Sequence, residues 1–272
     1  MTSDTGQVPD AAAVAAGWPA PAPGAAPRAK MIMAQAGLET RMLVRNGEQL
    51  LLTLVIPVLL LTAFSLDRHL VSEGTTKPVN FLVPSMIALA VLSTAFTSQA
   101  IATGFERRYG VLKRLGSTPL SRGGLIGAKT VTVIGVELAQ TAILIAVGLA
   151  LGWQPNAGPG AAVWVALLVL VGTAAFSGLA LLLAGTLRAE ATLALANLVY
   201  LLLLGIGGII FPLTKFPASA QPVLTLLPSG ALSDGLHKVL QHGSGLPLRD
   251  LAVLAVWAVI TITLAARLFR WE

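Results

Sequence analysis

The chain has 272 residues, of which 55% are hydrophobic and 11% are charged, and its mean hydropathy is +0.81. Soluble domains carry about 25% charged residues, so this composition excludes an ordinary soluble protein and indicates an integral membrane protein. The net charge of +6 comes from basic residues placed between apolar runs, which argues against a nucleic-acid-binding face. The chain has no cysteine, which excludes disulfides, thiol nucleophiles and Cys-ligated metals.

Residues 1–29 are predicted to form a disordered tail. Their last part includes AAAVAAGWPAPAPGAAP, an uncharged tract whose prolines prevent a long helix and whose small side chains bury little area. The tail lacks the basic start and apolar core of a cleaved signal peptide. We therefore expect the first spanning segment to be retained.

The next stretch, residues 30–49, is predicted to be a helix lying on the membrane surface. Met31, Leu38 and Met42 fall on one helical face. The charged residues of the stretch lie on its other faces: Glu39, Arg41, Arg45 and Glu48. Such an amphipathic helix would rest its apolar face on lipid.

Six apolar segments are predicted to cross the membrane as helices. A span needs roughly 20 apolar residues, because a helix satisfies its own backbone groups where no water is present. The fold class is therefore an all-α integral membrane protein, with a membrane domain over residues 30–272. Its expected spans are about 50–66, 80–103, 125–152, 161–187, 191–211 and 250–267.

The basic residues predict the orientation of these spans. An even number of spans places both termini on one side, and thirteen of the eighteen Lys and Arg residues fall on that side. The positive-inside rule makes this side the cytoplasm. The outer side then holds residues 212–249, where five prolines interrupt apolar pieces too short to span, as in a re-entrant helical segment.

The second cytoplasmic stretch is ERRYGVLKRLGSTPLSR, residues 106–122, and it carries five basic residues. On a helical wheel one side holds Phe105, Tyr109, Leu112 and Leu115, whereas the basic residues lie opposite or flank it. This pattern predicts an amphipathic helix that ends before Pro119. The pattern alone suits either a topological anchor or a binding surface for another protein.

The order of motifs here resembles the cytoplasmic loop of the ATP-binding cassette type 2 (ABC-2) exporter permeases. The matching groups are Glu106-Arg107-Arg108, Gly110, Arg114-Leu115, Thr118-Pro119-Leu120-Ser121 and Gly127-Ala128-Lys129. Because many relatives have Gly directly before Lys or Arg, the inserted Ala128 leaves Lys129 without an assigned role. Later groups also resemble that family around its fifth span: Gly207-Gly208, Phe211-Pro212, Phe216-Pro217 and Leu227-Pro228. The resemblance covers about residues 30–270.

The resemblance implies a permease subunit, not an enzyme, that works as a pair, expected to be a homodimer, with two separate ATPase subunits.

 This chain has no G-x-x-x-x-G-K-[ST] phosphate loop, so ATP and magnesium would bind at the ATPase partner and this chain would hold no cofactor. In the family the cytoplasmic helix fits a cleft of that partner. The residues expected to make this contact are Glu106, Arg107, Tyr109, Gly110, Leu112, Arg114, Leu115, Thr118 and Pro119.

Polar residues within the predicted spans are candidates for a substrate path. Glu137 lies near the middle of the third span, where a charge is costly unless it faces protein, water or substrate. Gln140 lies close to it, and Asn197 and Tyr200 lie in the fifth span. A structural hydrogen bond or an interface between helices explains each of these residues as well as a substrate path does.

No metal site is predicted. The three histidines, His69, His237 and His242, all lie outside the predicted spans, and no H-E-x-x-H motif occurs. The same search finds no G-x-S-x-G motif and no pair of aspartates within a span, so a membrane hydrolase has no visible nucleophile or acid–base pair.

These observations favour the permease of an ATP-driven exporter that carries a hydrophobic or amphiphilic compound, such as a drug, lipid or glycan carrier. The expected location is a bacterial cytoplasmic membrane, with lipid around the spans and both termini in the cytoplasm. One alternative is a secondary transporter driven by protons through Glu137. Several buried ionisable residues are expected in that class, and only Glu137 stands out here. The other alternative is a membrane assembly subunit that transports nothing.

Overall fold

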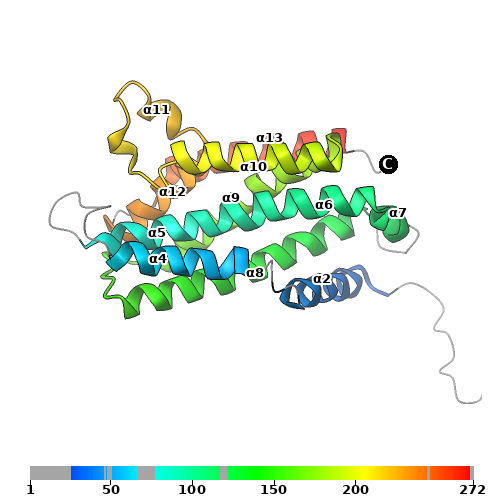
Figure 1. The fold of residues 1–272 in the computed structure, drawn as a ribbon, viewed down its shortest axis with the longest axis horizontal. Coiled ribbons are helices and arrows are strands. Elements are labelled where there is room, and N and C mark those ends of the chain that lie inside the picture. Colours follow the sequence, from blue (N-terminus) through cyan, green and yellow to red (C-terminus); the bar gives the residue numbers. More distant parts are fainter. Residues whose placement is uncertain are drawn as a thin grey trace, which may run out of the picture.

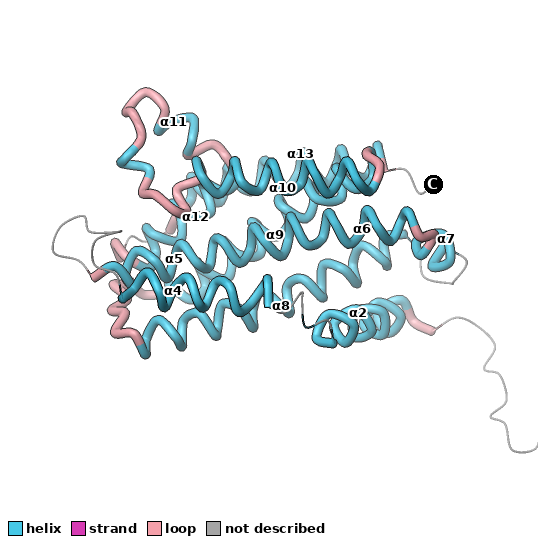
Figure 2. Tube along the Cα trace, viewed as in Figure 1, coloured by secondary structure: helices cyan, strands magenta, loops and turns pink. Residues whose placement is uncertain are grey.

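A computed structural model describes residues 26–45, 47, 51–66, 77–116, 122–243 and 246–269 of the chain. Every regular element within these ranges is a helix, and no strand occurs among them (Figure 2). The expected all-α membrane fold is therefore confirmed. Residues 1–25 of the predicted tail lie outside the described residues, and the first described helix already begins at Arg28.

The helices follow the predicted segments closely. Proline at the first position starts both α5 and α12, where its missing N–H has no helical partner to lose. The elements in chain order are α2 (Arg28–Arg45), η1 (Leu51–Val55), α4 (Ile56–Leu66), α5 (Pro78–Val91), η2 (Leu92–Ser98), α6 (Gln99–Arg108), α7 (Val111–Gly116), α8 (Arg122–Ala150), α9 (Ala161–Thr186), α10 (Ala189–Ile206), η3 (Leu213–Lys215), α11 (Gln221–Leu224), α12 (Pro228–Leu240) and α13 (Leu248–Leu268).

Five helices of the described chain are long and apolar enough to cross a membrane. They are Pro78–Arg108, Gly127–Ala150, Ala161–Thr186, Ala189–Ile206 and Leu248–Leu268. The first of the six expected spans is a shorter apolar helix, Thr53–Leu66, which falls below the roughly 20 residues that a span needs. The segments that flank this helix, 48–50 and 67–76, lie outside the described residues.

The long helices run side by side, and the connecting segments gather at the two ends of the bundle (Figures 1 and 2). One end holds α2, α7 and the C-terminal end of α13, whereas the opposite end holds α11 and α12 (Figure 1). The short helices predicted for residues 212–249 are therefore η3, α11 and α12, and they share one end of the molecule.

Helix α9 forms the centre of the bundle and packs against α13, α12, α6 and α8. Phe176 of α9 is fully buried, as are Leu232 of α12 and Leu254 of α13. Small residues allow α13 to approach closely, since a Cβ at Gly178 would lie 2.3 Å from Thr261 Oγ1. This contact explains why the small and hydroxyl residues of α9 lie on packed faces.

Two details differ from the sequence expectation. The amphipathic stretch around residues 105–115 is not one helix, because α6 ends at Arg108 and α7 begins at Val111, with Gly110 at a φ of 69° between them. The fifth span ends at Ile206, several residues earlier than expected, because Gly208 adopts a φ of 72°. In both places a glycine takes a backbone conformation that ends a helix.

Candidate functional site

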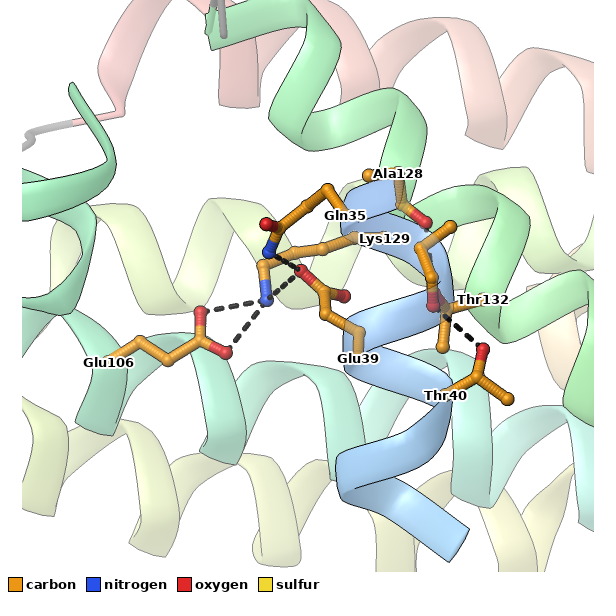
Figure 3. A network of polar contacts seen from close by, with 8 residues as sticks. Gln35, Glu39, Thr40, Glu106, Ala128, Lys129 and Thr132 are labelled. Atoms are coloured by element: carbon orange, nitrogen blue, oxygen red, sulfur yellow. Dashed lines mark hydrogen bonds and ion pairs between the residues drawn. The ribbon is translucent and has the colours of Figure 1, made fainter. Parts of the chain in front are cut away.

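The end of the bundle that carries α7 is organised around Lys129, near the start of α8 (Figure 3). The ammonium group of Lys129 lies 2.8 and 2.7 Å from the two carboxylate oxygens of Glu106 on α6. It also lies 3.7 Å from Glu39 Oε1 on α2. The side chain of Lys129 is 9% exposed, so one nearly buried cation joins three helices. Such a pair gains more from its charges than a surface ion pair, because water screens it less.

Helix α2 packs along α8 through a second set of contacts. Ala36 is buried against α8, and its carbonyl oxygen lies 3.2 Å from the Thr132 hydroxyl. Gln35 donates a hydrogen bond to Glu39 Oε1 at 3.0 Å, which holds that carboxylate near Lys129 (Figure 3). The amphipathic helix predicted for the membrane surface is therefore fixed to the bundle by ionic, polar and apolar contacts.

The arginines at the end of α6 connect it to the turn between α9 and α10. Arg107 donates a hydrogen bond to the carbonyl oxygen of Leu187 in that turn. Arg108 forms an ion pair with Glu190 in the first turn of α10. These two residues, together with Glu106, connect the last turn of α6 to four other elements: α2, α8, α10 and the α9–α10 turn.

Beyond these anchored residues, the chain presents an exposed aromatic side chain at Tyr109. Its side chain stacks on Phe105 with ring centroids 6.0 Å apart, and the Arg108 guanidinium lies 5.9 Å from its ring centroid. Tyr109 is nevertheless 66% exposed, and Val111 and Arg114 beside it on α7 are also exposed. The corner is therefore held by contacts of α6 with its neighbours and is exposed at Tyr109, where another protein could contact it.

The other predicted contact residues can be placed only in part. Gly110 forms the turn between α6 and α7. The side chains of Leu112 and Leu115, and the residues Thr118 and Pro119, lie outside the described part of the chain. Their role in the contact stays a prediction.

A layer of buried polar side chains crosses the middle of the bundle. Glu137 is 1% exposed and is hydrogen-bonded through Oε2 to the Thr173 hydroxyl of α9. Gln140 accepts a hydrogen bond from Thr94 at 3.1 Å and donates one to the Thr53 carbonyl oxygen at 2.7 Å. Both side chains point into protein and connect helices, so neither belongs to the wall of the large cavity described next.

A cavity with a volume of about 1020 Å³ lies between α4, the α5–α6 helix and α10. Asn197 and Tyr200 both line it, together with Ser93 of the π-helical segment η2. The Ser93 hydroxyl donates to the Tyr200 hydroxyl at 3.5 Å, a long hydrogen bond. The structure thus separates the four polar candidates into two groups, with Glu137 and Gln140 inside the bundle and Asn197 and Tyr200 on the cavity.

Histidine 237 occupies a buried position at the opposite end. Its Nδ1 lies 2.7 Å from the Ser233 carbonyl oxygen, and its Nε2 lies 3.2 Å from the Phe81 carbonyl oxygen. Burial lowers the pKa of His237 from 6.5, against the opposing effect of these two carbonyl oxygens and of Asp234. Among the described residues no group of three His, Asp or Glu side chains could hold a metal ion.

The model of the ABC-2 family transporter protein matches residues 62–267 of the chain. The chain belongs to this family. The match covers all five long apolar helices and the corner formed by α6 and α7. No curated protein matches the chain. The ABC-2 membrane domain is thus a multi-pass membrane protein and the permease part of an ABC transporter.

The motif comparison does not identify Lys129 as a site residue of this ABC-2 domain, because Ala128 separates it from Gly127. A different signal could have identified it. Lys129 is a single cation at the start of an apolar segment of more than twenty residues, and a charge in that position needs a carboxylate partner. Glu39 and Glu106 were available on neighbouring segments of the same side.

Proposed function

We propose that this chain is the permease subunit of an ATP-driven exporter, that it works with a second permease copy and two separate ATPase subunits, and that ATP and magnesium bind at those subunits. Membership in the ABC-2 family supports the pairing with an ATPase. The excess of basic residues on the α2 and α7 side supports a cytoplasmic position for that end and for both termini, in a bacterial cytoplasmic membrane.

The observation that carries this proposal is the exposed corner at Tyr109, which directly follows the last turn of α6, where Glu106, Arg107 and Arg108 contact neighbouring elements. A partner that moves α7 acts directly on the helix Pro78–Arg108. Lys129 and Arg108 then transmit that movement to α2, α8 and α10 through ion pairs. A local contact can therefore change the positions of several spans together, which export coupled to ATP hydrolysis requires.

The cavity beside α10 supports a hydrophobic or amphiphilic substrate. Its volume is at the upper end of the range for sites that hold drug-sized molecules, roughly 300–1,000 Å³. The same helix that ends at the Tyr109 corner forms one wall of this cavity through Leu89, Ser93 and Ile101. The substrate path and the ATPase contact would thus lie on one continuous helix.

The alternative of a proton-driven transporter rests on Glu137, and the geometry favours it less. Glu137 is enclosed by protein and does not line the cavity, so a substrate there would not contact it. An assembly subunit without transport would have no need for a large cavity between its spans.

The test is export from inverted vesicles that contain the chain and its ATPase subunit, with Tyr109→Ala compared with the parent. Loss of a buried aromatic contact of about 1.5–3 kcal/mol should weaken the complex roughly tenfold or more, and ATP-driven export should fall with it. Val223→Ala is the matched control, because Val223 is 62% exposed on α11 at the other end and should leave export unchanged.

Three results would contradict the proposal. Export driven by an imposed pH gradient without ATP would indicate the proton-driven transporter. Absence of export under either condition, with the complex intact, would indicate the assembly subunit. Equal export by Tyr109→Ala and the parent would remove the coupling role of the corner.

A further inference from the structure

The walls of the large cavity differ in polarity along its length. Contacts between helices show which residues lie at the same height along the bundle axis. Ser93 forms a hydrogen bond with Tyr200, and Gly104 packs against Thr192, so α10 runs antiparallel to the α5–α6 helix. Gln140 contacts both Thr53 and Thr94, which places the start of α4 at the level of η2. The polar lining residues therefore meet at one level: Thr53, Ser93, Thr97, Ser98, Asn197 and Tyr200. We refer to these six residues as the polar belt.

The rest of the lining is apolar. The longer apolar part extends from the polar belt toward the end that carries α11, past Met86, Leu82 and Phe211. Leu82 and Ser93 are eleven residues apart on one helix, so this part is roughly 16 Å long at 1.5 Å per residue. It suits an extended alkyl chain or a flat apolar ring system.

One group of the polar belt faces the cavity and lacks a hydrogen-bond partner within the described chain. The hydroxyl of Thr97 is also unpartnered, but it is buried in the protein and not exposed to the cavity. The amide of Asn197, exposed on the cavity side of α10, makes no hydrogen bond to any described residue. Unpaired polar groups inside the apolar part of a membrane are unfavourable, so a molecule in the cavity that donates to and accepts from this amide would be favoured.

The cavity also lacks charge. No Asp, Glu, Lys, Arg or His is among the described residues that line it. A charged group in this cavity would lose its hydration without gaining an opposite charge, which is strongly unfavourable. A neutral group that hydrogen-bonds the polar belt avoids that penalty.

We propose that the cavity selects uncharged amphiphiles, which place a neutral hydrogen-bonding group such as an amide or hydroxyl against Asn197 and an apolar body along the α5 and α4 walls. This inference rests on the proposed role of the cavity as a substrate path. It narrows the substrate class by excluding anionic lipids and permanently cationic compounds.

Binding to the permease alone tests this selectivity. The full chain in nanodiscs of neutral lipid is titrated with pyrenedodecanamide, with the ionised pyrenedodecanoate, and with methyl pyrenedodecanoate, which lacks a hydrogen-bond donor. Energy transfer from the five tryptophans to pyrene reports binding, after subtraction of partition into nanodiscs without protein. The amide should bind at least tenfold more tightly than the carboxylate, with the ester between them.

One variant assigns the preference to the polar belt. Asn197→Leu preserves side-chain volume and removes the unpaired amide, so it should weaken binding of the amide ligand about fivefold to tenfold. The ester should lose less, because it can only accept a hydrogen bond. Leu198→Ala is the control, because Leu198 is exposed next to Asn197 but does not line the cavity. It should leave all three affinities unchanged.

Binding of the carboxylate as tight as that of the amide would overturn the proposal. The proposal would also be overturned if Asn197→Leu kept the full preference for the amide, even if this variant changed the association of two permease copies. The proposed function is tested separately, since this assay needs no ATPase. ATP-driven export with no preference for the amide contradicts this inference alone, and a clear preference without ATP-driven export contradicts the proposed function alone.

Discussion

Replacement of Lys129 by methionine tests whether one cation holds α2 to the bundle. Methionine fills a similar volume and removes the charge, so Glu39 and Glu106 would remain beside each other without a counter-ion. The two carboxylates would repel each other and the contact between α2 and α6 through Lys129 would be lost. We expect α2 to separate from α8 and the folded state to lose stability.

The magnitude follows from the burial of the three groups. Removal of one partner from a buried ion pair costs about 3–5 kcal/mol. The Lys129 side chain is 9% exposed, but water reaches Glu106 at 27% and Glu39 at 17% exposure. We therefore expect Lys129→Met to lower the free energy of unfolding by about 2–3 kcal/mol, less than a fully buried pair would lose. Adding Glu106→Gln should restore about 1–2 kcal/mol, because the two sites are in direct contact.

Two measurements check this expectation. The free energy of unfolding is measured by denaturant titration in mixed micelles. The position of α2 is measured by maleimide labelling of an Ala36→Cys reporter, which would be the single thiol of the chain. Ala36 is 3% exposed, so the reporter should be protected in the parent background and should label readily with Lys129→Met. Lys113→Met, at an exposed position on α7, controls for a simple loss of positive charge at this end.

Lys129 does not hold α2 to the bundle if the free energies of unfolding of Lys129→Met and Lys113→Met differ by less than about 0.5 kcal/mol, the spread of ordinary surface substitutions, and the reporter stays protected. If the effects of Lys129→Met and Glu106→Gln on the free energy of unfolding simply add in the double variant, Lys129 and Glu106 do not interact.

Three further predictions concern other parts of the chain. The Thr173 hydroxyl has one proton and lies near two acceptors, Glu137 Oε2 and, at 2.7 Å, the Val169 carbonyl oxygen. Glu137→Gln can donate to Thr173 and should keep stability and export, whereas Glu137→Leu should lower the free energy of unfolding by about 1–3 kcal/mol. Loss of export in Glu137→Gln at unchanged stability would show that the charge is needed. Because burial lowers the pKa of His237 in the folded chain, the unfolded chain binds the imidazole proton more tightly. The denaturant midpoint of unfolding should therefore fall as the pH decreases below about 6.5, and it should fall less in His237→Gln. Equal pH profiles of the parent and His237→Gln would contradict this prediction. A membrane-impermeant maleimide added to intact cells should label Ser219→Cys but not Tyr109→Cys, and the reverse pattern would invert the proposed topology.

The sequence by itself determined the membrane class and most of the helix positions, and it predicts the side of each connecting segment. These properties depend on local quantities, namely the length of an apolar run, the turn-forming residues at its ends and the placement of basic residues. The ABC-2 family also followed from local motifs, and the comparison over residues 62–267 confirms it. The break at Gly110 escaped prediction because a helical wheel assumes a continuous helix, whereas a single glycine at positive φ ends one.

Only the tertiary structure decided which polar residues act together. Lys129, Glu106 and Glu39 lie far apart in the sequence, and they form one ionic group because α2 and α6 pack on either side of the start of α8. The same packing separates Glu137 from Asn197, which looked alike as polar residues within apolar spans. Glu137 turns toward α9 and is enclosed, while Asn197 turns toward the cavity beside α4. The direction of a side chain relative to neighbouring helices depends on contacts between distant segments, and no local pattern specifies it.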